Sequence, residues 1–167
     1  EYFILQSGTD VLDGGGGIDT LRLNRSGVGN SVVNLADGTA SGTWGGSAFS
    51  YSLSNIEQVF GTSFGTNTLT GDSGNNFLRG GAGNDTLDGG AGNDTLISTL
   101  GDDSVQGGAG DDEIFLGNGS NQVDGGEGFD TAIIGSVAHL IKVDFTTGTG
   151  GDQLQISGEA ADGTQQF

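Results

Sequence analysis

The chain has 167 residues and an unusual composition, with 36 glycines and no proline, cysteine or methionine. Its 4 basic and 22 acidic residues give a formal net charge of -18 at pH 7, which makes nucleic acid and anionic membrane surfaces unsuitable partners. The lack of cysteine excludes a disulfide framework, a zinc–thiolate site and a cysteine nucleophile, and no apolar run is long enough for a transmembrane segment.

The first predicted element consists of two nine-residue units, Leu5–Asp13 and Gly14–Arg22. Each unit has glycine at its fourth position, aspartate at its sixth and leucine at its eighth. The residues before Leu5 fit the tail of an earlier unit. We therefore expect residues 1–22 to be the end of a preceding block of repeats.

Residues 23–61 interrupt the repeats. Strands are predicted over Asn30–Ala36, Ala48–Leu53 and Ile56–Phe60, with turn signals at Asp37-Gly38 and Gly45-Gly46. We expect a β-rich insert that continues the same solenoid with wider coils.

From Thr62 to Ile133 the chain divides without a gap into eight nine-residue units. The fourth position is glycine in all eight, the sixth is aspartate or asparagine, and the eighth is apolar. The sixth positions are Asn67, Asn76, Asp85, Asp94, Asp103, Asp112, Asn121 and Asp130, and the eighth positions are Leu69, Leu78, Leu87, Leu96, Val105, Ile114, Val123 and Ala132.

Each unit combines a glycine-rich turn with a short strand whose residues alternate between the two faces. One turn reverses the chain, so two successive units make one coil of a solenoid. Strands two units apart then stack in parallel about 4.7–4.9 Å apart, with the eighth positions pointing inward. The fold class predicted is all-β, a parallel β-roll, over residues 62–133.

This stacking places Asp85 over Asp103, Asp94 over Asp112, and Asp112 over Asp130. Such pairs repel by about 4 kcal/mol at an effective dielectric constant of 20, and a divalent cation between them turns repulsion into attraction. Carboxylates and turn carbonyls form an all-oxygen site, which suits calcium better than magnesium, and zinc would prefer nitrogen or sulfur ligands. Several calcium ions are therefore predicted.

The units Gly80–Asp88 and Gly89–Ile97 resemble the RTX (repeats-in-toxin) family of hemolysin-type calcium-binding repeats, whose consensus is G-G-x-G-x-D-x-U-x. The resemblance covers Leu5–Arg22 and Thr62–Ile133. It implies a right-handed parallel β-roll with calcium ions between turns, each ion bound by one turn and the turn two repeats later. The ligands implied are the aspartate side chains and the turn carbonyls.

The resemblance places calcium at the three aspartate pairs above, and also at Asp103 with Asn121, Asn67 with Asp85, and Asn76 with Asp94. Units without the double glycine, such as Ser98-Thr99-Leu100, are expected to bind more weakly or not at all. The predicted metal ligands are Asp10, Asp19, Asp85, Asp94, Asp103, Asp112, Asp130, Asn76, Asn121, Gly81, Gly83, Gly90, Gly92, Gly101, Gly108, Gly110, Gly126 and Gly128. No catalytic residue and no other cofactor is predicted.

Two more strands are predicted around His139–Phe145 and Gln153–Ser157, in a C-terminal segment, residues 134–167, that we expect to cap the open end of the roll. Ninth positions of alternate units, Arg79, Ile97, Phe115 and Ile133, should form an outward apolar stripe. We expect the chain's own tail to cover this stripe, and docking by a partner is the alternative.

The resemblance implies a calcium-dependent folding and display module of a larger secreted protein, such as a toxin, an adhesin or a surface-layer protein. It also implies type I secretion, with folding on release and an extracellular or cell-surface location. The expected partners are calcium and adjacent domains of the parent chain, and a cell-surface or carbohydrate ligand is a further candidate.

Other hypotheses remain open. The segment could be the accessory module of a secreted protease, lipase or polysaccharide-modifying enzyme whose catalytic residues lie elsewhere. Action of the roll itself on a polysaccharide is less favoured, because the aspartate ladder already has a metal role. Ice binding is not favoured either, because the outward rows of threonine are interrupted.

Overall fold

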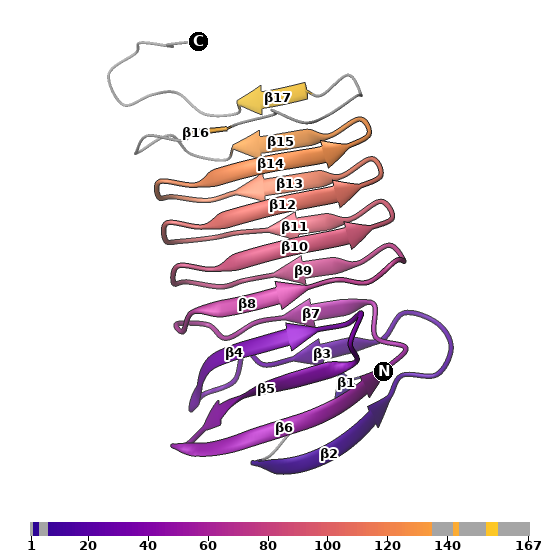
Figure 1. The fold of residues 1–167 in the computed structure, drawn as a ribbon. Coiled ribbons are helices and arrows are strands. Elements are labelled where there is room, and N and C mark those ends of the chain that lie inside the picture. The colour runs from indigo at the N-terminus through magenta and orange to yellow at the C-terminus, as the bar shows by residue number, and fades with distance from the viewer. Residues whose placement is uncertain (1, 4–6, 135–141, 144–152, 157–167) are drawn as a thin grey trace.

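A computed structural model describes residues 2–3, 7–134, 142–143 and 153–156, and every regular element in these ranges is a β-strand (Figure 1). The part of the chain that is described contains no helix able to cross a membrane. The strands are β1 (Tyr2–Phe3), β2 (Gly8–Asp13), β3 (Thr20–Arg22), β4 (Val28–Asn34), β5 (Thr39–Trp44), β6 (Ser47–Ser54), β7 (Gln58–Phe60), β8 (Asn67–Thr70), β9 (Phe77–Arg79), β10 (Thr86–Ala91), β11 (Thr95–Ile97), β12 (Ser104–Ala109), β13 (Glu113–Leu116), β14 (Gln122–Glu127), β15 (Thr131–Ile134), β16 (Lys142–Val143) and β17 (Gln153–Ile156).

These strands form two sheets that the chain visits alternately (Figure 1). One sheet runs in the order β1-β3-β7-β9-β11-β13-β15-β17, and the other in the order β16-β14-β12-β10-β8-β4-β5-β6-β2. Within the roll the pairs are parallel and two units apart, as in Leu87 opposite Val105 and Leu96 opposite Ile114. The predicted parallel β-roll is therefore confirmed.

The core lies between the two sheets. All eight predicted eighth positions are buried, from Leu69 at 0% to Val105 at 2% exposed. Their neighbours on each strand face outward, as the alternation of buried and exposed residues in Ser104–Ala109 shows. Most strands of the roll place one apolar side chain in the core, and β13 and β15 place two, so the core is thin. Each such side chain contributes only about 1.5–3 kcal/mol.

The insert enters the second sheet as a three-stranded excursion rather than as a wider parallel coil. Strands β4 and β5 pair antiparallel, as do β5 and β6, while β4 and β6 join the parallel strands β8 and β2 on either side. The predicted strands match β4, β6 and β7 approximately, but the prediction missed β5 (Thr39–Trp44). Its small and hydroxylated residues bury only Ala40, so they lack the apolar alternation of a strand.

Larger side chains fill the core beside the insert. Phe49 and Tyr51 of β6 are buried and their rings stack with centroids 4.8 Å apart. Gly42 of β5 lies against the Phe49 ring, where a side chain would not fit. The insert is therefore fixed to the roll by an apolar core that needs no metal.

The predicted outward stripe exists in the first sheet. Arg79, Ile97, Phe115 and Ile133 are paired in register on successive strands. The row continues toward the N-terminus through Phe60, with Arg22 stacked 4.3 Å from the centre of the Phe60 ring. The tail expected to cover this stripe lies outside the described residues, apart from β16 and β17. These two strands fall within the predicted C-terminal strands and add one strand to each sheet.

Candidate metal centre

The sixth-position residues stand at the ends of the turns, immediately before or at the start of a strand. Because the chain passes from one sheet to the other at two edges of the roll, these residues form two columns. The first column is Asn67, Asp85, Asp103 and Asn121, and the second column is Asn76, Asp94, Asp112 and Asp130. All eight side chains are buried, between 0% and 4% exposed.

A hydrogen-bond ladder runs along each column. The backbone N–H of Asp85 donates to Oδ1 of Asp103 at 2.8 Å, and the N–H of Asp94 donates to Oδ1 of Asp112 at 2.8 Å. The same bond from one coil to the next is made by Asn67, Asn76, Asp103 and Asp112. One oxygen of each acceptor side chain is thereby satisfied by the preceding coil.

In three of these aspartates the second carboxylate oxygen is left without a donor in the described part of the chain. Oδ2 of Asp85, Asp94 and Asp112 is buried and accepts no hydrogen bond. An ionised carboxylate in such a position is destabilising by several kcal/mol unless a cation or donor compensates it. Calcium would supply that compensation, and it prefers carboxylate and carbonyl oxygens.

The pKa values of these aspartates also indicate that burial disfavours their ionised form. The pKa of Asp112 is raised to about 7, chiefly by burial. The Asp94 N–H opposes this shift, and the carboxylates of Asp94, Asp130 and Asp111 add to it. Burial likewise raises the pKa of Asp94 to about 6. Burial also raises the pKa of Asp85 and of Asp103 above the usual value.

Glycines shape the space around each carboxylate. A methyl group at Gly80 or Gly89 would overlap the carboxylate of Asp85 or Asp94 in the same turn. Gly83 has φ of +139°, and a methyl group there would lie 2.6 Å from the carbonyl oxygen of Gly65 in the preceding coil. The turn carbonyls therefore point from one coil at the glycines of the next.

This arrangement fits an all-oxygen cation site. The described residues contain no cluster of three or more histidine, cysteine, aspartate or glutamate side chains that could hold a metal ion. Carboxylates alone would therefore not complete a coordination shell, and turn carbonyls would have to supply the remaining oxygens. A hard cation with several oxygen ligands, such as calcium, suits this donor set.

The structure brings most of the predicted ligands together. Asp85, Asp103, Asn121, Gly81, Gly83 and Gly101 lie in the stacked turns of the first column, and Asp94, Asp112, Asp130, Asn76, Gly90, Gly92, Gly108, Gly110, Gly126 and Gly128 lie in those of the second. The remaining two, Asp10 and Asp19, lie elsewhere.

Asp10 does not lie in a stacked turn. It is exposed in the middle of β2, where it pairs with Tyr51 of the insert. The position two units later is Val28, which pairs with Trp44. The insert therefore occupies the place of the coil that would have carried a second acid, and Asp10 is not brought beside one.

Asp19 is buried, and its neighbour is a residue that the sequence interpretation missed. The backbone N–H of Asp19 donates to Oε2 of Glu57 at 2.8 Å, the same kind of bond as that between Asp85 and Asp103. Glu57 stands immediately before β7, which pairs with β3, just as Asp103 stands immediately before β12. An acid directly before a strand was the available signal, but its separation of 38 residues does not match a whole number of coils.

A second ladder on the outer side of the turns was also missed. Side-chain oxygens at the fifth position accept from the fifth-position N–H of the next coil, as in Asn84 to Asp102 at 3.0 Å and Asn93 to Asp111 at 3.1 Å. Asn75, Asp102 and Asp111 make equivalent bonds. This ladder runs opposite in direction to the sixth-position ladder, so the coils that it joins are linked by two hydrogen bonds at each turn.

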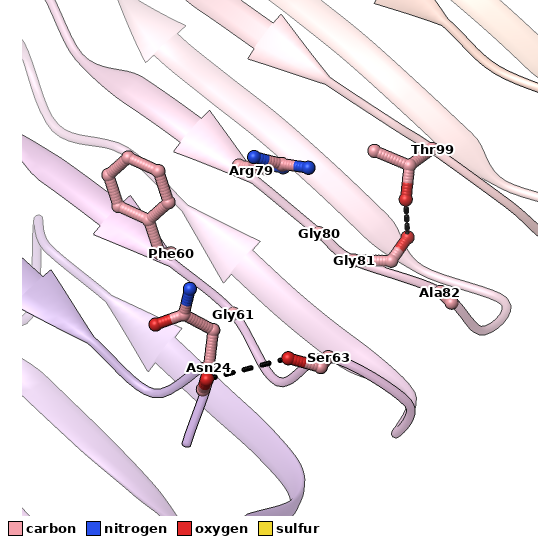
Figure 2. A pocket seen from close by; sticks show the side chains of 9 residues that line it. All are labelled: Asn24, Phe60, Gly61, Ser63, Arg79, Gly80, Gly81, Ala82 and Thr99. Carbon is pink, nitrogen blue, oxygen red and sulfur yellow. Dashed lines mark hydrogen bonds between the residues drawn. The ribbon is translucent and has the colours of Figure 1, made fainter. Parts of the chain in front are cut away.

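A separate pocket lies at the junction of the insert and the roll (Figure 2). It is lined by Phe60, Arg79 and the backbone of Gly80-Gly81, with Ser63 donating to the Asn24 carbonyl oxygen at 3.5 Å and the Thr99 hydroxyl donating to the Gly81 carbonyl. No carboxylate lines this pocket, so it is not a candidate metal site.

Comparison with protein-family models matches residues 5–22, 62–96 and 97–132 to the RTX calcium-binding nonapeptide repeat, in four copies. The search of curated proteins finds no match. The matched ranges include all residues of both columns.

Proposed function

Because the chain belongs to the RTX calcium-binding nonapeptide repeat family, we propose that the two columns are its calcium sites and that calcium controls the folding of the roll. The family is a calcium-binding structural module rather than a catalytic one. The chain is accordingly a calcium-binding β-roll.

Five coil interfaces are proposed to bind calcium. In the first column they are those of Asp85 with Asp103 and of Asp103 with Asn121. In the second column they are those of Asn76 with Asp94, Asp94 with Asp112, and Asp112 with Asp130. The aspartate side chains would hold the ion together with carbonyls of the stacked turns, including those of Gly81, Gly83, Gly90, Gly92, Gly101, Gly108, Gly110, Gly126 and Gly128. Bound calcium supplies positive charge where coils otherwise place acids together.

The observation that carries this proposal is the buried, unpartnered Oδ2 of Asp85, Asp94 and Asp112. A fold that buries such atoms repeatedly, in a chain of net charge -18, is destabilised by its own acids until cations bind. Extracellular calcium sites have dissociation constants of about 10⁻⁴–10⁻³ M. Each site therefore contributes about 1.4 kcal/mol at a tenfold excess of calcium, and almost nothing at the low calcium level of cytoplasm.

We propose on this basis a module of a larger secreted protein, such as a toxin, an adhesin or a surface-layer protein. The acids would keep the chain extended during export, and millimolar calcium outside the cell would fold it. The family match supports this role, because RTX repeats occur in proteins of type I secretion.

Circular dichroism during a calcium titration tests the folding switch. The β signal of the purified chain should be substantially lower in excess chelator, where the coils of the roll are only partly folded. It should increase cooperatively at millimolar calcium, and equal magnesium should not replace calcium. Equal β content in chelator and in calcium would overturn the proposal.

A further inference from the structure

The first turn of the roll differs from those that follow it. Gln58 and Phe60 of β7 pair with Phe77 and Arg79 of β9, and Thr68 of β8 pairs with Thr86 of β10. Counted between these paired positions, the chain from Phe60 to Thr68 is one residue longer than the chain from Arg79 to Thr86. Phe64 in this longer turn is 91% exposed.

This longer turn ends at Asn67, whose side chain is completely buried, with hydrogen-bond partners at both its Nδ2 and its Oδ1. Its Nδ2 lies within hydrogen-bond distance of the carbonyl oxygens of Gly65 at 3.0 Å, Gly80 at 3.2 Å and Thr62 at 3.4 Å, and of Oδ1 of Asp85 at 2.8 Å. These four acceptors come from both coils of the interface. They are turn carbonyls and a sixth-position carboxylate, the same classes of oxygen that would hold calcium elsewhere.

The other side of the same amide is satisfied as well. Oδ1 of Asn67 accepts from the N–H of Thr62 at 2.8 Å and from Oγ of Ser31, on strand β4 of the insert, at 2.7 Å. The amide therefore links the insert, the first turn of the roll and the second coil.

Asparagines at other sixth positions do not do this. Nδ2 of Asn121 donates to the Gly117 carbonyl oxygen at 3.2 Å, within its own turn. Oδ1 of Asn76 accepts from the N–H of Asp72, again within its own turn. Gathering acceptors from two coils around an amide nitrogen is thus particular to Asn67 among these three residues.

We infer that the interface between turns 61–67 and 80–85 is closed by the Asn67 amide in place of a calcium ion. An amide nitrogen carries two hydrogens and no charge, so it satisfies oxygens that would otherwise repel each other. The nitrogen lies within hydrogen-bond distance of all four oxygens and so occupies the space between them, although its two hydrogens serve two of these oxygens at a time. The sequence predicted calcium at Asn67 with Asp85, and we infer instead that this interface holds no metal ion.

This joint gives the roll a base that does not depend on calcium. The insert already has an apolar core around Phe49 and Tyr51, and Asn67 extends its fixed structure to Asp85. Calcium-dependent coils can then add to a preformed edge, which reduces the ordering required for the first ion to bind.

The inference rests on calcium binding by the aspartate turns, and an Asn67→Asp variant tests it separately. The introduced carboxylate would face Asp85 with no amide between them. The variant should bind one more calcium per chain than the wild type in isothermal titration. In excess chelator its β4 and β8 amides should exchange with deuterium about tenfold faster or more, because a buried network is lost, and calcium should restore their protection.

Two further variants complete the test. Asn67→Ala should lose the same protection in chelator, but calcium should not restore it, because no ligand has been added. Asn84→Asp makes the matched change at an exposed position, and the new side chain can still accept the hydrogen bond from the Asp102 N–H. This variant should bind the same number of calcium ions as the wild type.

The possible outcomes separate the two proposals. A wild type that binds no calcium would overturn the proposed function. A wild type that binds calcium, together with an Asn67→Asp variant that binds the same number of ions, would overturn the inference alone. Amide protection of β4 and β8 that is as high in Asn67→Ala as in the wild type, both measured in chelator, would also overturn it.

Discussion

The backbone N–H of Asp94 donates a hydrogen bond of 2.8 Å to Oδ1 of Asp112, the equivalent aspartate one coil later. The other oxygen of Asp112 is buried without a hydrogen-bond partner among the described residues. One carboxylate therefore has two separable tasks. Its Oδ1 joins coils through a neutral donor, and its Oδ2 is the oxygen proposed to bind calcium. Replacing aspartate by asparagine keeps the first task and removes the charge needed for the second.

Asp112→Asn should weaken calcium binding and stabilise the calcium-free roll. The substitution retains the acceptor for Asp94 but removes a ligand from the interfaces on both sides. Each site lost should remove about 1.4 kcal/mol at a tenfold excess of calcium over its dissociation constant. Denaturant unfolding with and without calcium measures both effects. The control is Asp111→Asn, an exposed residue whose bond to Phe129 is retained. It should have much smaller effects on both, because Asp111 acts on Asp112 only through its charge. Equal calcium-induced stabilisation in Asp112→Asn and wild type would contradict the assignment of Asp112 as a ligand.

Lowering the pH should partly replace calcium in the metal-free protein. Folding raises the pKa of Asp112 to about 7 and that of Asp94 to about 6, from an ordinary value of 3.8, chiefly because of burial. The folded state therefore takes up protons, so its stability increases as the pH falls from above 7 toward 4 and decreases as the pH rises through 6 to 7. Unfolding in chelator between pH 4.5 and pH 8 measures this slope. The slope should be smaller in Asp112→Asn, and an unchanged slope would exclude Asp112 as its source.

Calcium affinity should show the opposite dependence on pH. If Asp94 and Asp112 bind calcium as ionised carboxylates, calcium must displace protons from them at pH values below their raised pKa. Calcium binding to the folded chain should therefore release protons at pH 5.5 and few at pH 8, which titration calorimetry in buffers of different ionisation enthalpy measures. Equal proton release at the two pH values would indicate that these two aspartates are not ligands.

Gly89→Ala should destabilise the second column. A methyl group at this position would overlap the Asp94 carboxylate and the carbonyl oxygen of Gly107 in the next coil. Overpacking of this kind typically lowers the free energy of unfolding by about 1–3 kcal/mol. The matched control is Gly16→Ala, since a methyl group there meets nothing within 4 Å. Denaturant unfolding in saturating calcium compares the two, and equal stability would show that the turn can open to admit the methyl group.

Glu57→Ala should loosen the joint between the N-terminal coil and the insert. The Glu57 side chain accepts the Asp19 N–H at 2.8 Å, and an unsatisfied buried amide costs about 1–3 kcal/mol. Glu57→Gln keeps an acceptor oxygen and should be affected less. Hydrogen exchange of β3 should therefore be faster in Glu57→Ala than in Glu57→Gln. Identical exchange in the two variants would mean that the bond does not stabilise β3.

The repeating part of this protein was predictable from its sequence alone. Each coil contacts the next at a constant separation of two units, so the same requirement recurs in every unit and appears as a period. An apolar side chain at position eight, glycine at position four and an oxygen-bearing side chain at position six all meet such a recurring requirement. The columns of Asp85 with Asp103 and of Asp94 with Asp112 follow from that period, and the structure places them as expected.

Only the tertiary structure decided what happens where the period fails. The antiparallel strand β5, the position of Glu57 beside Asp19 and the four acceptors around the Asn67 amide depend on contacts at irregular separations or on a turn one residue longer. The sequence pattern is the same whether the side-chain amide of a sixth-position asparagine bonds within its own turn or to two coils. The distinction lies in which carbonyls surround it, and that is a property of the folded chain rather than of the local sequence.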